Sequence, residues 1–366
     1  MSAPSILSAM PLPVQVTALQ QVQDYPAVSL LLTTAPAPEL TRPDVLRLHA
    51  LAATAVRRLR AELPPETTTP MIRRLDALVE QARTGPAGRA LALYASSGKE
   101  AVVRLPIDVR DRVVIDPTFA TRDLVRALHR TPRHLVLTLN TGQAHLYDAV
   151  ADTLRPALTS AFPLYAARRP TRGRGRGDRP GRDVDAPDFN RRVDAALGAY
   201  LRLHPAPLVL VGDERATAAF RRMSINCDRL AGTVRGNLIP TSPGDLATRI
   251  RTSLDEYLHR RQNEALALLD RRSAAGRVAS GMPSAWLAAR TLRPEMLAVD
   301  ETLYYPARLS DDGDTLIPAT DVDHPAVIDD AVDELIELVL NRGGWIAFTA
   351  PGALDRHHGV ALSLQR

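Results

Sequence analysis

The 366-residue sequence is poor in several residue types that build recognisable sites: it has one cysteine, Cys227, and one lysine, Lys99. A single cysteine excludes an intrachain disulfide framework and a zinc site built from cysteines. No run of about eighteen apolar residues occurs, which excludes a membrane-spanning helix. Residues 1–13 lack the basic start and apolar core of a secretory signal. These absences predict a cytoplasmic protein with no membrane partner.

Motifs that support catalysis, metal binding or cofactor binding are also missing. Among nine histidines only His357 and His358 are adjacent, and neither has companions at metal-ligand spacing. Gly98-Lys99 lacks the upstream glycine of a phosphate-binding loop, and Gly212-Asp213 is not followed by a glycine-rich dinucleotide fingerprint. No Gly-x-Ser-x-Gly elbow is present. The sequence therefore predicts no cofactor, no metal site and no catalytic residue.

Arginine supplies almost all of the positive charge. The chain has 46 basic and 41 acidic residues, a formal net charge of +5. The preference for arginine, together with 29 prolines, is typical of a GC-rich coding genome. Its distribution is more informative, because residues 168–192 contain nine arginines and four aspartates while the remainder of the chain is formally neutral. One cationic segment is thus attached to a neutral body.

Within this region, residues 168–182 alternate arginine with glycine and proline. Glycine and proline disfavour helices and central strands, so the pattern predicts a long loop. Guanidinium groups bind phosphate bidentately and stack on bases, which favours contact with RNA. A solvated linker of biased composition is the alternative interpretation. The residues predicted to bind RNA are Arg168, Arg169, Arg172, Gly173, Arg174, Gly175, Arg176, Gly177, Arg179 and Arg182.

The opposite charge gathers near the C-terminus. Residues 300–337 contain twelve acidic residues and one arginine, Arg308. Such a segment repels phosphate, so it predicts either a surface for a basic protein partner or a solvated helix face.

The length predicts two or three domains. Strand-like and helix-like patterns alternate, which predicts an α/β (α+β) protein with domains at 14–130, 131–225 and 226–366. In the middle domain, residues 134–147 are typical of two antiparallel strands joined by a tight turn. A helix over 189–203 is expected after the basic loop, which we place at 168–188.

Taken in order, several segments resemble the bacterial relatives of archaeo-eukaryotic peptide release factors, a group that includes Pelota. The similar segments are 26–33, 90–96, 104–106, 113–116, 134–147, 208–213, 276–281, 296–299, 328–335 and 342–345. The resemblance implies three domains. The middle one is a mixed-sheet domain with a long loop, and the C-terminal one is an α/β/α layered domain of the type found in kink-turn-binding ribosomal proteins.

In release factors the middle-domain loop carries a Gly-Gly-Gln motif that promotes hydrolysis of peptidyl-tRNA. The corresponding loop here, 168–188, has no glutamine, and Thr141-Gly142-Gln143 is predicted to be a hairpin turn instead. The resemblance implies a factor that binds the ribosome through rRNA, with tRNA as a second contact, in rescue, quality control or hibernation. A translational GTPase is the further partner that it implies. The alternatives are a peptidyl-tRNA hydrolase that uses another loop residue and a non-ribosomal RNA-binding stress protein.

Overall fold

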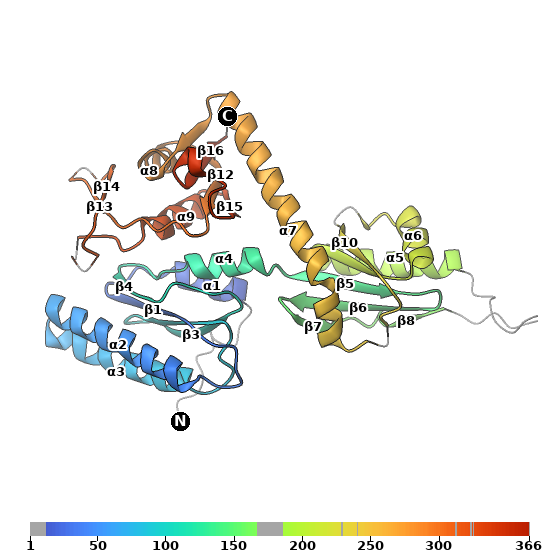
Figure 1. The fold of residues 1–366 in the computed structure, drawn as a ribbon, viewed down its shortest axis with the longest axis horizontal. Helices are drawn as coiled ribbons and strands as arrows, with labels where there is room; N and C mark the ends of the chain where they lie inside the picture. Colours follow the sequence, from blue (N-terminus) through green and yellow to red (C-terminus); the bar gives the residue numbers. More distant parts are fainter. Residues whose placement is uncertain are drawn as a thin grey trace, which may run out of the picture. The chain divides into compact units, whose positions relative to one another are not determined.

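The computed structural model describes residues 12–166, 186–227, 230–239, 241–311, 313–322, 324 and 326–365. The chain folds into two compact units (Figure 1). Unit 1 combines Met1–Arg130 with Gln262–Arg366, and unit 2 is Thr131–Arg261. Each unit contains helices and sheets, so the α/β prediction is confirmed. No helix in the described part of the chain is long and apolar enough to cross a membrane.

The N-terminal part of unit 1 is an antiparallel sheet in the order β3-β2-β1-β4, with helices on both faces (Figure 1). Its two central strands, β1 and β2, are almost continuously apolar and buried, as expected for a sheet covered on both sides. One face packs against α2 and α3, and the other against α1 and α4. The bounds are α1 Leu12–Gln20, β1 Ala27–Thr33, α2 Arg42–Glu62, α3 Pro65–Ala82, β2 Ala90–Ala95, β3 Glu100–Leu105, β4 Arg112–Asp116 and α4 Arg122–Arg130.

The C-terminal part of unit 1 has a mixed sheet in the order β11-β16-β12-β15, in which β12 and β15 are parallel. Residues of α8 and α9 share one apolar core with residues of α1 and α4, so the two parts of unit 1 pack together. The bounds are β11 Val278–Ser280, α8 Met282–Thr291, β12 Pro294–Asp300, β13 Ala307–Leu309, β14 Leu316–Pro318, α9 Ala331–Asn341, β15 Trp345–Thr349, η3 Asp355–His357 and β16 Val360–Leu364.

Part of the acidic segment 300–337 is paired within unit 1 and does not face solvent. The Asp330 carboxylate lies 2.7 Å from the Arg122 guanidinium and 3.5 Å from that of Arg112, and all three side chains are buried. Asp333 lies 3.2 Å from Arg112. Both arginines belong to the N-terminal part of the chain, which the segment's own composition does not reveal. Much of the local negative charge is therefore neutralised within unit 1.

Unit 2 is built on a sheet in the order β10-β9-β5-β6-β7, with β8 paired to β6. β5 and β6 are antiparallel, which confirms the predicted strand pair, and β9 is parallel to both β5 and β10. Helices α5 and α6 cover one face and α7 covers the other. The bounds are β5 His134–Leu139, β6 Gln143–Val150, β7 Thr153–Pro156, β8 Leu164–Tyr165, α5 Ala186–Leu203, β9 Leu208–Gly212, α6 Glu214–Met223, β10 Leu230–Arg235 and α7 Pro243–Ala274.

The sheet of unit 2 continues beyond residue 225, where we had expected the middle domain to end. β10 pairs with β9 from Leu230 onward, and the first turns of α7 bury Leu246 and Ile250 against the sheet. The unit needs both elements, because without α7 one apolar face of the sheet would be exposed. The division of the whole chain into three domains stays a prediction.

Candidate nucleic-acid interface

The ten residues predicted to bind RNA all lie within 167–185, outside the described residues. The structure does describe the two elements on either side of this stretch. β8 ends at Tyr165, just before it, and α5 begins at Ala186, just after it. The candidate interface is therefore built from the strand and the helix that flank the Arg/Gly segment, which we define as residues 167–185.

The strand that leads into the Arg/Gly segment lies beside the β5–β6 turn. Tyr165 pairs with Gln143 and Leu164 pairs with Ala144, in antiparallel register. The Ala166 amide donates to the Gly142 carbonyl oxygen at 2.9 Å. The Thr141-Gly142-Gln143 sequence is thus adjacent to Tyr165 and Ala166, the last described residues before the segment, a proximity that their separation of more than twenty residues did not suggest.

The turn itself is tight and closed by its own backbone. The Asn140 side-chain oxygen accepts from the amides of Gly142 at 2.9 Å and Gln143 at 2.8 Å. The Asn140 amide donates to the Gln143 carbonyl oxygen at 3.0 Å. These bonds form an Asx-type turn, which confirms the hairpin predicted here. Gln143 is consequently the first residue of a strand with a fixed backbone.

Three side chains lie at the described edge of this interface: His145, Tyr165 and Arg192. The rings of His145 and Tyr165 meet edge to face with centroids 6.3 Å apart. Burial lowers the pKa of His145, so its ring is neutral near pH 7. The Arg192 guanidinium on α5 donates to the Tyr165 carbonyl oxygen at 3.4 Å, which ties the helix to the strand on the other side of the segment. An exposed ring and arginine at one edge are groups that stack on bases and bind phosphate.

Positive charge is concentrated in unit 2 as a whole. Thr131–Arg261 contain 21 arginines and 13 acidic residues, a formal charge of +8, whereas the rest of the chain has 25 basic and 28 acidic residues. Residues 168–192 carry +5 of this charge, so the rest of unit 2 contributes a further +3. Excess positive charge on one folded unit is typical of proteins that bind nucleic acid.

The comparison with family models identifies this region. Residues 133–293 match the bacterial archaeo-eukaryotic release factor family 3. The resemblance inferred from the sequence is confirmed over this stretch, which covers nearly all of unit 2. A comparison with curated proteins found no match.

Solved structures that resemble the chain include release factors and their relatives. An archaeal translation termination factor, aRF1, is 13% identical over 97% of both chains, with a TM-score of 0.27. Archaeoglobus fulgidus Pelota is 13% identical over 99% of this chain and 93% of its own, with a TM-score of 0.37. A ribosome-bound archaeal Pelota is 13% identical over 98% and 95%, with a TM-score of 0.42.

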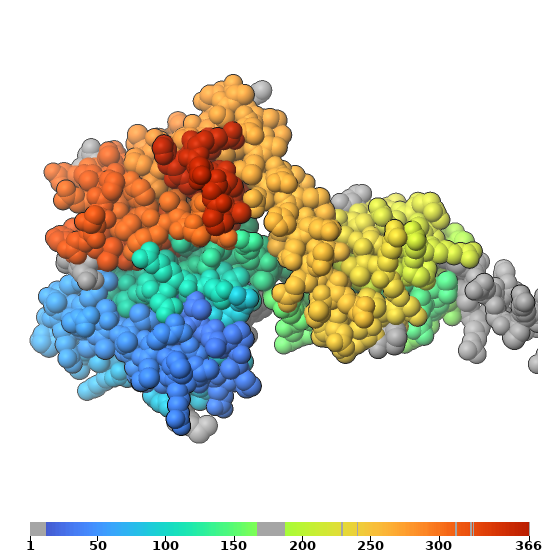
Figure 2. Space-filling model, viewed as in Figure 1, coloured from blue at the N-terminus to red at the C-terminus, as the bar shows by residue number. Residues whose placement is uncertain are grey.

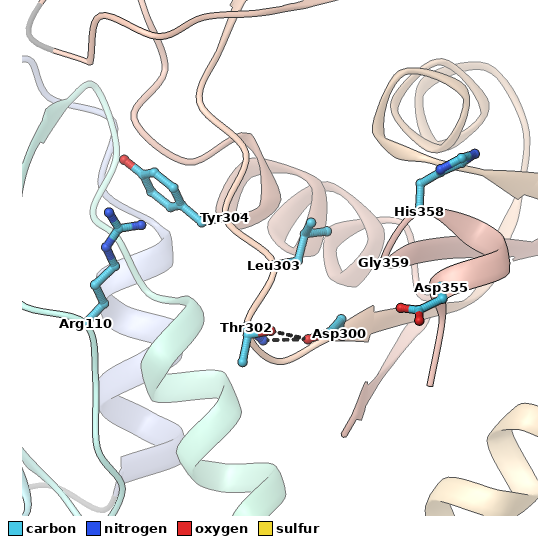
Figure 3. A pocket seen from close by; sticks show the side chains of 8 residues that line it. All are labelled: Arg110, Asp300, Thr302, Leu303, Tyr304, Asp355, His358 and Gly359. Carbon is cyan, nitrogen blue, oxygen red and sulfur yellow. Dashed lines mark hydrogen bonds between the residues drawn. The ribbon is translucent and has the colours of Figure 1, made fainter. Parts of the chain in front are cut away.

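Outside the release-factor family match, unit 1 has an open pocket of about 590 Å³ (Figure 3). The Arg110 guanidinium lies 4.4 Å from the centre of the Tyr304 ring on one side, and Asp355 and His358 lie on the other. Asp300 accepts from the Thr302 amide, the Thr302 hydroxyl and the Gly352 amide at 2.6–2.9 Å, so both of its carboxylate oxygens are engaged. Because these bonds hold two loops in place, Asp300 has a structural role in this pocket.

A serine–histidine pair in unit 1 also has a structural explanation. The Ser280 hydroxyl lies 2.7 Å from His357 Nδ1, and the histidine is buried. Burial lowers the pKa of His357, and among the described residues no carboxylate lies within hydrogen-bonding distance of its ring. The pair links η3 to β11 and lacks the orienting acid of a catalytic triad. Among the residues that the structure describes, no group of three or more potential metal ligands lies close together.

Proposed function

We propose that this protein is a ribosome-binding translation factor of release-factor shape. It acts in ribosome rescue, quality control or hibernation, in the cytoplasm, and it does not hydrolyse peptidyl-tRNA. The observation that best supports this proposal is the release-factor family match over residues 133–293, because the matched region includes the whole Arg/Gly segment. The excess of arginine in unit 2 supports ribosomal RNA as the direct partner.

The proposal that hydrolysis is absent rests on the chemistry of the loop. Release factors use a glutamine in this loop, and no glutamine occurs from Arg168 to Asp188. The nearest candidate, Gln143, starts a strand whose backbone is fixed by Asn140 and Tyr165. A short side chain on a paired strand cannot reach into a distant catalytic centre as a loop tip does.

The partners follow from charge. The Arg/Gly segment would contact rRNA, with tRNA as a second possible contact. A translational GTPase remains a proposed partner of the C-terminal part of unit 1. Since Asp330 and Asp333 pair with Arg112, such a contact would use exposed acidic residues of the β13–β14 connection, such as Asp311.

Co-sedimentation with purified bacterial ribosomes over a range of salt concentrations tests this function. Replacing Arg172, Arg174 and Arg176 by alanine removes up to three phosphate contacts, so the log–log salt slope should flatten by roughly 2. Binding to free RNA without binding to ribosomes would support the stress-protein alternative. An unchanged affinity and salt slope in the triple variant would leave the Arg/Gly segment as a linker.

A further inference from the structure

Helices α5 and α6 lie side by side over one face of the sheet in unit 2 (Figure 1) and form part of the yellow-green surface in Figure 2. The acidic side chains of both helices are engaged. Asp188 lies 3.4 Å from Arg191, and Glu214 lies 3.2 Å from Arg235. Asp194 is buried and accepts hydrogen bonds from the loop after α6. None of these three carboxylates is left to balance other positive charge on the two helices.

Several arginines on the same helices are not neutralised in this way. They are exposed, and no ion pair or hydrogen bond to them is recorded within the described ranges: Arg202, Arg215, Arg221 and Arg222. Because the acids on these helices already have partners, they do not neutralise these arginines. The two helices therefore present a surface of net positive charge. Such a surface attracts a polyanion.

The loop after α6, residues 224–227, is fixed to α5 by Asp194. The Ser224 hydroxyl and the Ile225 amide donate to the Asp194 carboxylate, and the Asn226 side-chain amide donates to the Asp194 carbonyl oxygen at 3.1 Å. Gly198 makes room for this arrangement, because a Cβ there would lie 2.8 Å from the Asn226 side chain. The loop therefore has one well-defined position against the helix.

This fixed loop holds an apolar side chain in solvent. Ile225 is 81% exposed, and it lies three residues after Arg222, just beyond the end of α6. An exposed isoleucine loses the favourable free energy that its burial would give. The hydrogen bonds of the loop to Asp194 keep the Ile225 backbone in this exposed position. An exposed apolar side chain on a fixed loop, a few residues from exposed arginines, suits an RNA surface, on which arginines bind phosphates and an apolar group packs against sugars or base edges.

We propose that the exposed residues Arg215, Arg221 and Arg222 of α6, with Ile225 of the loop after it, form a second RNA-binding surface. We call this surface the α5–α6 face, because Asp194 of α5 holds the loop in place. It is rigid and is built entirely from residues outside the Arg/Gly segment. The inference rests on the proposed function, since the RNA would be ribosomal. It differs from that function in its prediction that binding persists when the arginines of the segment are removed.

The first test removes charge. The Arg221→Ala/Arg222→Ala double variant should bind purified bacterial ribosomes more weakly, and its log–log salt slope should flatten by about 1.5, at about 0.7–0.9 per phosphate contact. The Arg73→Ala/Arg249→Ala double variant is the matched control, because it removes the same charge from exposed positions on α3 and α7. Equal affinities and slopes for the two double variants would overturn the inference.

The second test separates the apolar contact from the charges. Ile225→Ser should lower the affinity roughly tenfold at every salt concentration without changing the salt slope, since it removes no charge. A wild-type affinity in this variant would exclude Ile225 from the surface.

Repeating both tests with deproteinised ribosomal RNA identifies the partner. Losses seen with intact ribosomes but not with bare RNA would assign the face to an acidic protein and overturn the inference. If the wild-type protein fails to bind ribosomes, the proposed function is contradicted. The bare-RNA measurement still shows whether the α5–α6 face binds RNA.

Discussion

Arg112 shows how single residues hold the two parts of unit 1 together. Its buried guanidinium lies within 3.5 Å of carboxylates of Asp123, Asp330 and Asp333. Arg112→Ala leaves these acids without their shared counter-charge, so it should lower the free energy of unfolding by about 3–5 kcal/mol. Urea denaturation measures this change. Arg89→Ala, which breaks an exposed pair with Asp108, is the control and should cost under about 1 kcal/mol.

Asp116, at the end of β4, should make stability depend on pH. Burial, with the nearby carboxylates of Asp329 and Glu334, raises the pKa of Asp116 to about 7. In the unfolded chain its pKa is about 3.9. The folded protein therefore binds this proton more tightly, and the associated stability is present at low pH and is lost as pH rises through about 7.

Asp116→Asn replaces the titrating group by a neutral one. The free energy of unfolding of the variant, relative to that of the wild type, should be higher at pH 8 than at pH 5. Urea denaturation of both proteins at the two pH values measures this difference. Burial also raises the pKa of Glu337 to about 7, so part of the pH dependence of stability should remain in the variant. A constant difference between the two proteins across this range would contradict the assignment to Asp116.

At the scale of elements, the contact between α5 and the loop after α6 depends on Gly198. Alanine favours a helix by about 1 kcal/mol over glycine, but a Cβ at 198 meets the hydrogen-bonded Asn226 side chain. Because overpacking costs about 1–3 kcal/mol, Gly198→Ala should be destabilising overall. Gly244→Ala in α7 is the matched control, since a Cβ there meets nothing within 4 Å, and it should not destabilise. Thermal unfolding of the two variants distinguishes these outcomes.

Helix α3 begins earlier than its sequence pattern predicts. The apolar repeat predicts a helix from Pro70, but α3 begins at Pro65 and contains Pro70. Its first turns bury Thr68 and Met71 against the sheet. Pro65 suits the first helical position, and packing of the early turns outweighs the backbone hydrogen bond that Pro70 cannot make.

For the whole molecule, the proposed function predicts binding without catalysis. Added to ribosomes that carry peptidyl-tRNA, the protein should release no peptide above background. Gln143→Ala should leave both this result and ribosome binding unchanged, because Gln143 is held in a strand next to its turn. Release that disappears in this variant would instead establish a peptidyl-tRNA hydrolase.

The sequence alone determined the features that depend on local pattern. The apolar pattern of 134–147 with its tight turn predicted the β5–β6 hairpin, and the helix expected over 189–203 lies within α5. The ordered segments also led to the release-factor family, whose model matches residues 133–293. Each of these signals is contained within a few neighbouring residues.

Only the tertiary structure decided which charges remain available. Asp330 and Asp333 look like part of an acidic surface until Arg112, more than two hundred residues earlier, is found beside them. Conversely, Arg221 and Arg222 look like ordinary solvated residues until the neighbouring acids prove to be engaged elsewhere. The free charge of a surface depends on pairings between distant segments, because Coulomb interactions act through space rather than along the chain.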